Sequence, residues 1–232
     1  MGEETLYRAY GRRAPRISEL GGVVEDRWRL ERALSATEGQ VTGFAAAVAL
    51  LNYSRDNGDL GVTYPIEQKL SVSSLWSMMA ARDGAIRVRD FEDAMNGANG
   101  YLKKCAGESL QLPIISPYKM LDEAFPQRAK IRHAAAHTTA RNKNDEQAER
   151  HSANGPYEAP GISIGPGATN TTIQDMLINS TYTSTWSGEF VSYDLSLKSF
   201  QVLENIKCAF FDMIPEQMLY KDPWPSPPNL SP

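Results

Sequence analysis

A long helical pattern in this chain is centred on Val41-Thr42-Gly43-Phe44-Ala45-Ala46-Ala47-Val48-Ala49-Leu50-Leu51. Its apolar positions recur roughly every 3.6 residues, the spacing that places side chains on one face of an α-helix. The pattern extends outward from Val23 to about Arg55, and Asn57-Gly58-Asp59 ends it. We therefore predict a long amphipathic helix with one buried face. The apolar members of that face are Trp28, Leu34, Val41, Phe44, Ala45, Val48 and Leu51.

Two further segments have the same helical period. One begins at Ser71 or Ser73, either of which can cap a helix, and continues towards Leu102. The other follows Ser196 near the end of the chain, and a short helical turn over 118–125 lies between them. The apolar face of the last helix comprises Phe200, Leu203, Ile206, Phe210 and Ile214. The fold class is therefore predicted to be mainly α, an antiparallel helical bundle that forms one domain over residues 23–220.

A small β-hairpin insertion is predicted between the short helix and the last one. Residues 182–186 and 190–193 are rich in threonine, valine and aromatic side chains, and Ser187-Gly188-Glu189 separates them as a turn. The hairpin aromatics are expected to close over the helical core, and the alternative is that they stack on nucleic-acid bases. These aromatics are Tyr182, Trp186, Phe190 and Tyr193.

Three other segments lack a regular pattern. Residues 1–22 combine arginines with glycines and a proline, which predicts a flexible basic arm. Residues 140–170 are first charged and then rich in glycine and proline, which predicts a mobile loop. Residues 221–232 contain five prolines and should form an extended tail.

Composition limits the classes of function. The 232 residues are 41% apolar, which supplies a core, and the net charge of -4 argues against a protein that coats nucleic acid by bulk charge. Cys105 and Cys208 lie far apart and outside any C-x-x-C pair, so neither a disulfide framework nor a thiolate zinc site is indicated. We find no apolar run near the roughly 18 residues of a membrane span and no secretion signal. A cytoplasmic protein without membrane contact is expected.

Arginine and histidine concentrate in Arg128-Ala129-Lys130-Ile131-Arg132-His133-Ala134-Ala135-Ala136-His137. Two of the three histidines of the chain lie here. Histidine exchanges a proton near neutral pH, whereas arginine keeps its charge and suits phosphate. Because the alanines favour a helix, the segment indicates phosphoryl chemistry carried out from a helix.

The helical spacing suggests how such a site is assembled. Arg132 and His137 lie about 140° apart around a helix, whereas His133 and His137 share a face. If the same helix of a second subunit lies across a two-fold axis, both arginines and both histidines can converge on one phosphate. RNA carries its own nucleophile, the 2′-hydroxyl, so a histidine acting as general acid or base and an arginine stabilising charge are sufficient. We therefore expect RNA cleavage to a 2′,3′-cyclic phosphate with no metal and no cofactor.

The hexapeptide Arg132-His133-Ala134-Ala135-Ala136-His137 resembles the signature of HEPN (higher eukaryotes and prokaryotes nucleotide-binding) domains, which is arginine, a polar residue, three variable residues and histidine. The likeness extends to the layout of helices over roughly residues 23–214. The resemblance implies a homodimeric, metal-independent endoribonuclease, often a toxin or antiviral defence effector, with an antitoxin or other regulatory partner. It also implies that Arg132 and His137 are the catalytic pair and that His133 orients the site. Beside them, Arg128 and Lys130 are expected to contact phosphate or RNA.

Several alternatives stay open. The bundle can be catalytically inactive and serve as a binding or dimerisation module, or it can be a structural, self-assembling, coat-like protein. A zinc site on His133 and His137 is a weaker hypothesis, because the segment lacks the glutamate of His-Glu-x-x-His and the charge of Arg132 repels a cation.

Overall fold

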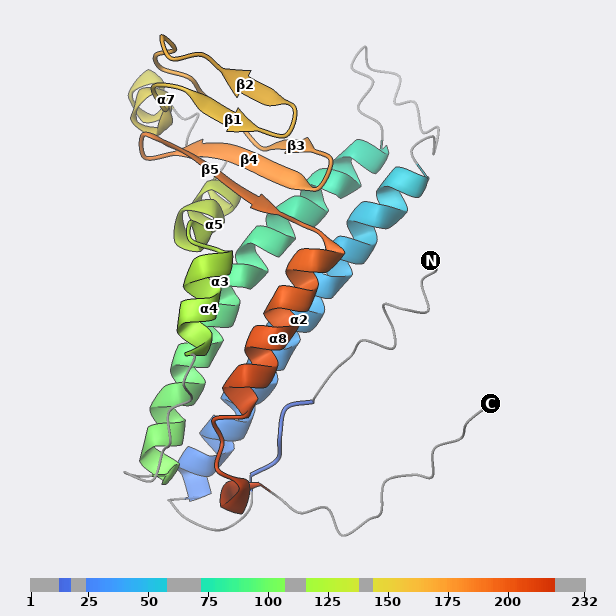
Figure 1. Ribbon diagram of the computed structural model, residues 1–232, viewed down its shortest axis with the longest axis vertical. Coiled ribbons are helices and arrows are strands. Elements are labelled where there is room, and N and C mark those ends of the chain that lie inside the picture. Colours follow the sequence, from blue (N-terminus) through green and yellow to red (C-terminus); the bar gives the residue numbers. More distant parts are fainter. Residues whose placement is uncertain (1–12, 18–23, 58–71, 107–115, 138–143, 220–232) are drawn as a thin grey trace.

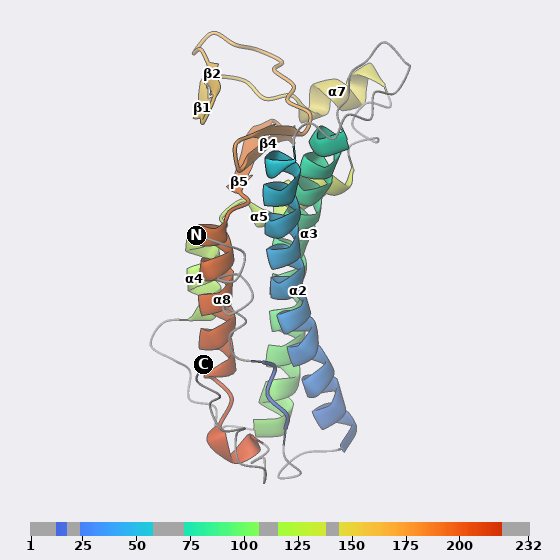
Figure 2. The same cartoon turned by 90° about the vertical axis from the view of Figure 1, so that its right-hand side faces the viewer.

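The computed structural model describes residues 13–17, 24–57, 72–106, 116–137 and 144–219, and this part of the protein is mainly α-helical. Two long helices, α2 (Val24–Asp56) and α3 (Val72–Ala106), run antiparallel along the length of the molecule (Figure 1). Helices α4 (Pro117–Ala124) and α8 (Leu197–Phe211) pack against one side of that pair (Figure 2). The prediction of a mainly α, antiparallel bundle is therefore confirmed.

Local sequence explains where these helices begin and end. Glu25 and Asp26 lie in the first turn of α2 and Arg55 lies in its last turn. The helix dipole favours negative charge at the first end and positive charge at the last. Helix α4 has Pro117 at its first position, where the missing N–H costs no hydrogen bond. Helix α8 is capped as predicted, since the backbone N–H of Ser199 donates to Ser196 Oγ at 3.3 Å.

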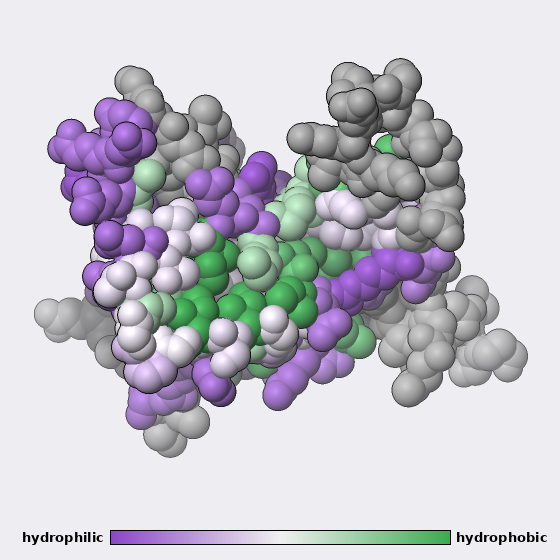
Figure 3. Space-filling view, turned by 90° about the horizontal axis from the view of Figure 1, so that it is seen from above, coloured by the Kyte–Doolittle hydropathy of each residue, from purple (hydrophilic) through white to green (hydrophobic). Residues whose placement is uncertain are grey.

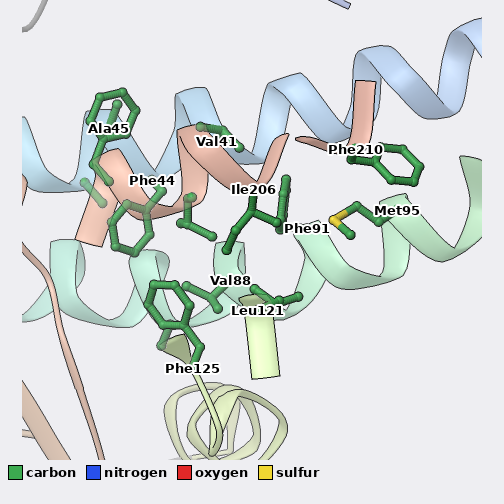
Figure 4. Close-up of a cluster of buried hydrophobic side chains, with 14 of the residues drawn as sticks. Val41, Phe44, Ala45, Val88, Phe91, Met95, Leu121, Phe125, Ile206 and Phe210 are labelled. Carbon is green, nitrogen blue, oxygen red and sulfur yellow. The ribbon is translucent and has the colours of Figure 1, made fainter. Parts of the chain in front are cut away.

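A single apolar core joins the four helices. Figure 4 shows side chains from α2, α3, α4 and α8 meeting between the helices. Phe44 of α2 lies edge-on to Phe125, with ring centroids 6.5 Å apart. All five apolar positions predicted for the last helix are buried, although Ile214 lies beyond its end. Trp28, by contrast, is 56% exposed and lies under the guanidinium of Arg32, so its predicted place on the buried face of the first helix was wrong.

The predicted hairpin is confirmed and belongs to a three-stranded antiparallel sheet. Strand β4 (Thr181–Trp186) pairs with β5 (Glu189–Asp194) on one side and with β3 (Met176–Ile178) on the other. The turn has positive φ at Ser187 and Gly188, the geometry of a tight two-residue hairpin. Tyr182 and Tyr193 are buried under the sheet, as expected of aromatics that close the core.

The prediction of a long loop over 140–170 was wrong in its described part, which begins at Asn144. That part contains α7 (Asp145–His151) and a second hairpin, β1 (Tyr157–Ala159) and β2 (Ile162–Ile164). Pro160 and Gly161, with φ of 76° at the glycine, form the tight turn between these two strands and not part of a long loop. The hairpin is tied to the rest of the chain by two backbone hydrogen bonds between Ala153 and Thr171.

The described part of the predicted basic arm is held in place. The backbone N–H of Ala14 donates to Glu38 at 2.8 Å and that of Ile17 to Glu31 at 2.9 Å, both on α2. Ile17 is buried and pairs with Leu219, just after the short 3-10 helix η2 (Glu216–Met218). The rest of the arm, 1–12 and 18–22, and the tail over 221–232 lie outside the described residues.

One described helix, α2, is long and apolar enough to cross a membrane by length and composition alone. Its apolar side chains pack against α3 and α8 (Figure 4). The apolar face of α2 therefore lies in the core of the described part of the protein. Figure 3, a view onto the sheet end of the molecule, shows apolar side chains gathered at the centre with hydrophilic ones around them.

Candidate functional site

The arginine-histidine segment forms α5 (Arg128–Ala136), which lies between α3 and strands β4 and β5 (Figure 1). Ile131, Ala134 and Ala135 are the buried side of this helix. The helix ends at His137, whose φ of -115° and ψ of 32° leave the helical region while its N–H still donates to the His133 carbonyl at 3.0 Å. His137 therefore projects from the end of the helix rather than from its middle.

The structure brings His133 and His137 together and leaves both exposed to solvent. Their ring centroids lie 6.0 Å apart and their planes differ by 17°. Arg132 lies next to them and is partly exposed, and it forms no ion pair with the residues that the structure describes. The three residues of the predicted catalytic set thus lie on the second half of α5 and at its C-cap.

Trp186, which was not among the predicted site residues, has its ring near those of all three histidines. The Trp186 ring centroid is 5.8 Å from that of His133, 6.2 Å from that of His137 and 4.1 Å from that of His151, with interplanar angles of 13°, 28° and 24°. We call Trp186, His133, His137 and His151 the Trp186 cluster. The cluster was not predicted, because the sequence pattern favours a mobile loop around His151 and a place for Trp186 among the core aromatics. The available signal was that the chain has only three histidines.

His151 supports this cluster from the buried side. It is 8% exposed, and the backbone N–H of Ser187 donates to its Nδ1 at 3.2 Å. A nitrogen that accepts a hydrogen bond carries a lone pair, so the proton of the neutral ring is on Nε2. Helix α7 thereby links its last residue to the turn of the β4–β5 hairpin.

The electrostatic surroundings of His133 favour its neutral form. Partial desolvation by its neighbours lowers the pKa of the exposed His133 below its usual value, and the charges of Arg132, His137 and Arg89 lower it further. A neutral imidazole can accept a proton, which is the state that a general base requires at neutral pH.

Arg128, a predicted phosphate contact, is occupied by acidic partners. Its guanidinium lies 2.6 Å from Glu92 Oε1 and 2.6 Å from Asp122 Oδ1, and Nε donates to Glu92 Oε2 at 2.8 Å. The hydrogen bond from Arg128 lowers the pKa of Glu92. Only 11% of the Arg128 side chain is exposed. The residue therefore joins α5 to α3 and α4.

Lys130, the other predicted contact, also has an acidic partner. Its ammonium lies 2.5 Å from Glu189 Oε1 in the β4–β5 hairpin, and both side chains are about half exposed. An exposed pair of this kind is weak and exchanges partners easily. Lys130 can therefore release Glu189 and bind a phosphate, whereas the enclosed Arg128 cannot.

The charged pair Arg82 and Asp83 has structural partners. Arg82 binds Asp175 Oδ2 at 2.6 Å and so ties α3 to the sheet, while Asp83 pairs with Arg87 one turn along. Among the described residues, three or more metal-ligating side chains do not gather anywhere.

Comparisons with family models, with curated proteins and with solved structures found no match. The fold and the site together define a mainly α protein with an exposed arginine-histidine motif beside an aromatic cluster.

Proposed function

We propose that the protein is a metal-independent endoribonuclease of HEPN type whose site is completed by a second copy of the chain. One observation carries the proposal. The neighbouring cations Arg89, Arg128 and Lys130 each pair with a carboxylate, whereas Arg132 has no acidic partner among the described residues. An unpaired guanidinium beside two exposed imidazoles is the arrangement that an anionic phosphodiester would complete.

In the proposed reaction, a histidine removes the proton of the 2′-hydroxyl, and the 2′-oxygen attacks the adjacent phosphorus. The bond from phosphorus to the 5′-oxygen breaks as the new P–O bond forms, and a second histidine gives its proton to the leaving 5′-oxygen. Arg132 stabilises the negative charge that develops on the other phosphate oxygens. The products are a 2′,3′-cyclic phosphate and a free 5′-hydroxyl, so the step needs no metal and no redox partner.

The exposed surface of α5 supports a homodimer. Ala129 and Ala136 are both exposed and lie one turn before and one turn after His133 on the same face of α5. Small side chains allow two helices to approach closely. Two copies of α5 placed across a two-fold axis would bring His137 of one chain near His137 of the partner subunit.

Purified protein should cut single-stranded RNA in the presence of EDTA. We expect Arg132→Ala and His137→Ala each to lower the rate about 10²-fold or more, because each removes a group that acts on the reacting phosphate. Lys119→Ala, an exposed residue of α4, is the control and should cut at the wild-type rate. The readout is cleavage of a labelled RNA with analysis of the product ends.

Equal cleavage by wild type and His137→Ala would refute this function. RNA binding without cleavage by the wild type would instead identify the binding module that the sequence left open.

The proposed setting follows from the resemblance and is part of the proposal. A cytoplasmic ribonuclease that can act as a toxin or antiviral effector must be kept inactive in its own cell. We therefore propose a regulatory or antitoxin partner that covers the exposed end of α5.

A further inference from the structure

We propose that Trp186 is a positioning residue: its indole holds the imidazoles of His133 and His137 in one parallel orientation, and His151 holds the indole. The catalytic consequence rests on the proposed ribonuclease function, whereas the positioning itself does not.

The ring geometry is the first support. The centroids of His133, His137 and Trp186 form a nearly equilateral triangle with sides of 5.8, 6.0 and 6.2 Å. The three planes agree within 28°. Exposed histidines ordinarily sample several rotamers, and broad χ2 wells leave the ring plane undefined. Two exposed imidazoles parallel to one indole therefore indicate a common constraint.

The indole is itself fixed on its buried side. Trp186 is the last residue of β4, and the turn that follows it is held by the hydrogen bond from the Ser187 N–H to His151 Nδ1. The His151 ring lies 4.1 Å from the Trp186 ring, the shortest ring separation in the cluster. Because His151 is buried, it cannot move aside without opening the packing beneath α7.

The Gln127 side chain holds α5 in register with the strand that follows this turn through two hydrogen bonds. The Gln127 side chain donates to the Phe190 carbonyl at 3.1 Å and accepts from the Ser192 N–H at 3.2 Å. Lys130 pairs with Glu189, which is directly opposite Trp186 in the ladder. The helix that carries the histidines and the hairpin that carries the indole thus form one unit.

Orientation of this kind matters for proton transfer. A misplacement of about 1 Å in a catalytic group can cost about 10²-fold in rate, since the donor and acceptor must meet within hydrogen-bond distance. A group that limits rotation of His133 and His137 therefore acts on the rate of the chemical step. It need not touch the RNA.

The first test is independent of enzyme activity. The chain has three histidines, so an NMR spectrum of the imidazole Cε1–Hε1 groups contains three signals, which His133→Gln and His137→Gln assign. In Trp186→Leu, which keeps apolar bulk but loses the flat face, we expect the His133 and His137 signals to move towards those of an unstructured chain. In Trp186→Phe, which keeps a flat ring, they should stay near the wild-type positions.

Trp76→Leu is the matched control. Trp76 is also partly buried and lies beside an aromatic ring, that of Tyr53, with centroids 5.9 Å apart and planes tilted by 36°, but it is outside the cluster. This variant should leave all three histidine signals in place. If Trp186→Leu does not fold, Trp186→Met replaces it, because methionine fills similar space with a flexible chain. Unchanged His133 and His137 signals in a folded variant without the indole would overturn the proposal.

The second test measures the catalytic consequence. For RNA cleavage we expect Trp186→Leu to lower kcat about 10-fold or more with KM within about 2-fold of wild type, and Trp186→Phe to recover most of the loss. A wild type that does not cut RNA would remove the ribonuclease function, and the NMR result would still decide the role of Trp186. If the signals move but kcat does not change, the positioning role in catalysis is wrong.

Discussion

At the scale of single residues, two arginines on one short helix have opposite roles. Arg128 and Arg132 lie one turn apart on α5, yet Arg128 is enclosed by Glu92 and Asp122 whereas Arg132 faces solvent without an acidic partner among the described residues. A half-buried guanidinium is stable only if its charge and its donors are satisfied. Position relative to α3, rather than residue type, therefore separates the structural arginine from the candidate catalytic one.

Arg128→Met should destabilise the protein by about 2 kcal/mol, because Glu92 is then left with Arg89 alone in a site that is 13% exposed. Arg132→Met, the matched substitution one turn away, should change the free energy of unfolding by less than about 0.5 kcal/mol. Urea unfolding followed by circular dichroism measures both. Equal effects of the two substitutions would show that the Arg128 ion pairs contribute nothing to stability.

The same ion pair predicts a dependence on pH. The pKa of Glu92 is lower in the folded protein than its ordinary value of 4.5, mainly because of the hydrogen bond from Arg128. The unfolded chain therefore takes up this proton at a higher pH than the folded one. The stabilisation is complete above pH 4.5 and is lost as the pH falls through the lowered pKa. The wild type should lose its stability advantage over Arg128→Met across that acidic range, which unfolding curves at several pH values will measure. An advantage that is constant with pH would contradict this assignment.

At the scale of elements, α3 shows where tertiary contacts override helix propensity. Two of its three glycines, Gly84 and Gly97, lie in the helix interior, where glycine is ordinarily less favourable than alanine. A Cβ at Gly84 would lie 2.6 Å from the Tyr193 hydroxyl and 2.7 Å from Leu195 Cδ1, whereas a Cβ at Gly97 would meet nothing within 4 Å. The buried Tyr193 hydroxyl donates to the Ala81 carbonyl, so it has little freedom to move.

Gly84→Ala should therefore destabilise the protein by about 1–3 kcal/mol through overpacking. Gly97→Ala should stabilise it by about 0.5–1 kcal/mol, the gain expected when alanine replaces glycine in an exposed helix. Thermal and urea unfolding of the two variants side by side provide the measurement. A gain in stability at both positions would mean that the sheet does not constrain this part of α3.

At the scale of the whole molecule, the long helices supply the core, and α5, α7 and the sheet supply the site. Helices α2, α3, α4 and α8 enclose the apolar residues, while α5, α7 and the β4–β5 hairpin meet at one end and form the Trp186 cluster. The two parts are joined by Arg82 and Asp175 and by the buried Tyr193. This arrangement lets the surface end of α5 carry exposed polar groups without weakening the core.

The proposed homodimer gives a prediction at this scale. In multi-angle light scattering the wild type should have twice the 25.7 kDa mass of one chain. Ala129→Glu adds a bulky charge to the exposed face of α5 and should give a monomer that cuts RNA at least about 10-fold more slowly. Ala46→Glu, at an exposed alanine of α2, is the control and should remain dimeric and active. A monomeric wild type, or an Ala129→Glu variant that stays dimeric, would exclude α5 as the dimer contact.

Periodicity in the sequence was sufficient for the helical frame. The 3.6-residue spacing of apolar side chains placed the two long helices and the last one within a few residues of their bounds, because burial of one face is a local pattern that a long helix repeats many times. The hairpin over 182–193 was predicted from its β-branched and aromatic residues, because these residue types favour strands. The short strands over 157–164 were missed, since three-residue strands around a Pro-Gly turn contain too few repeats to be distinguished from a loop.

The amino-acid sequence alone was sufficient to predict the mainly α class, the main helices, the hairpin and the arginine-histidine segment. Each of these features depends on the types and spacing of residues that are close together in the chain. The packing of the chain, by contrast, gives Arg128 two acidic partners, leaves Arg132 without one among the described residues, and brings His151 and Trp186 to His133 and His137. The residues concerned are far apart in the sequence. His151 lies 18 residues and Trp186 53 residues from His133, and Glu92 lies 36 residues from Arg128. Burial and pairing are properties of the packed chain, so local spacing cannot encode them.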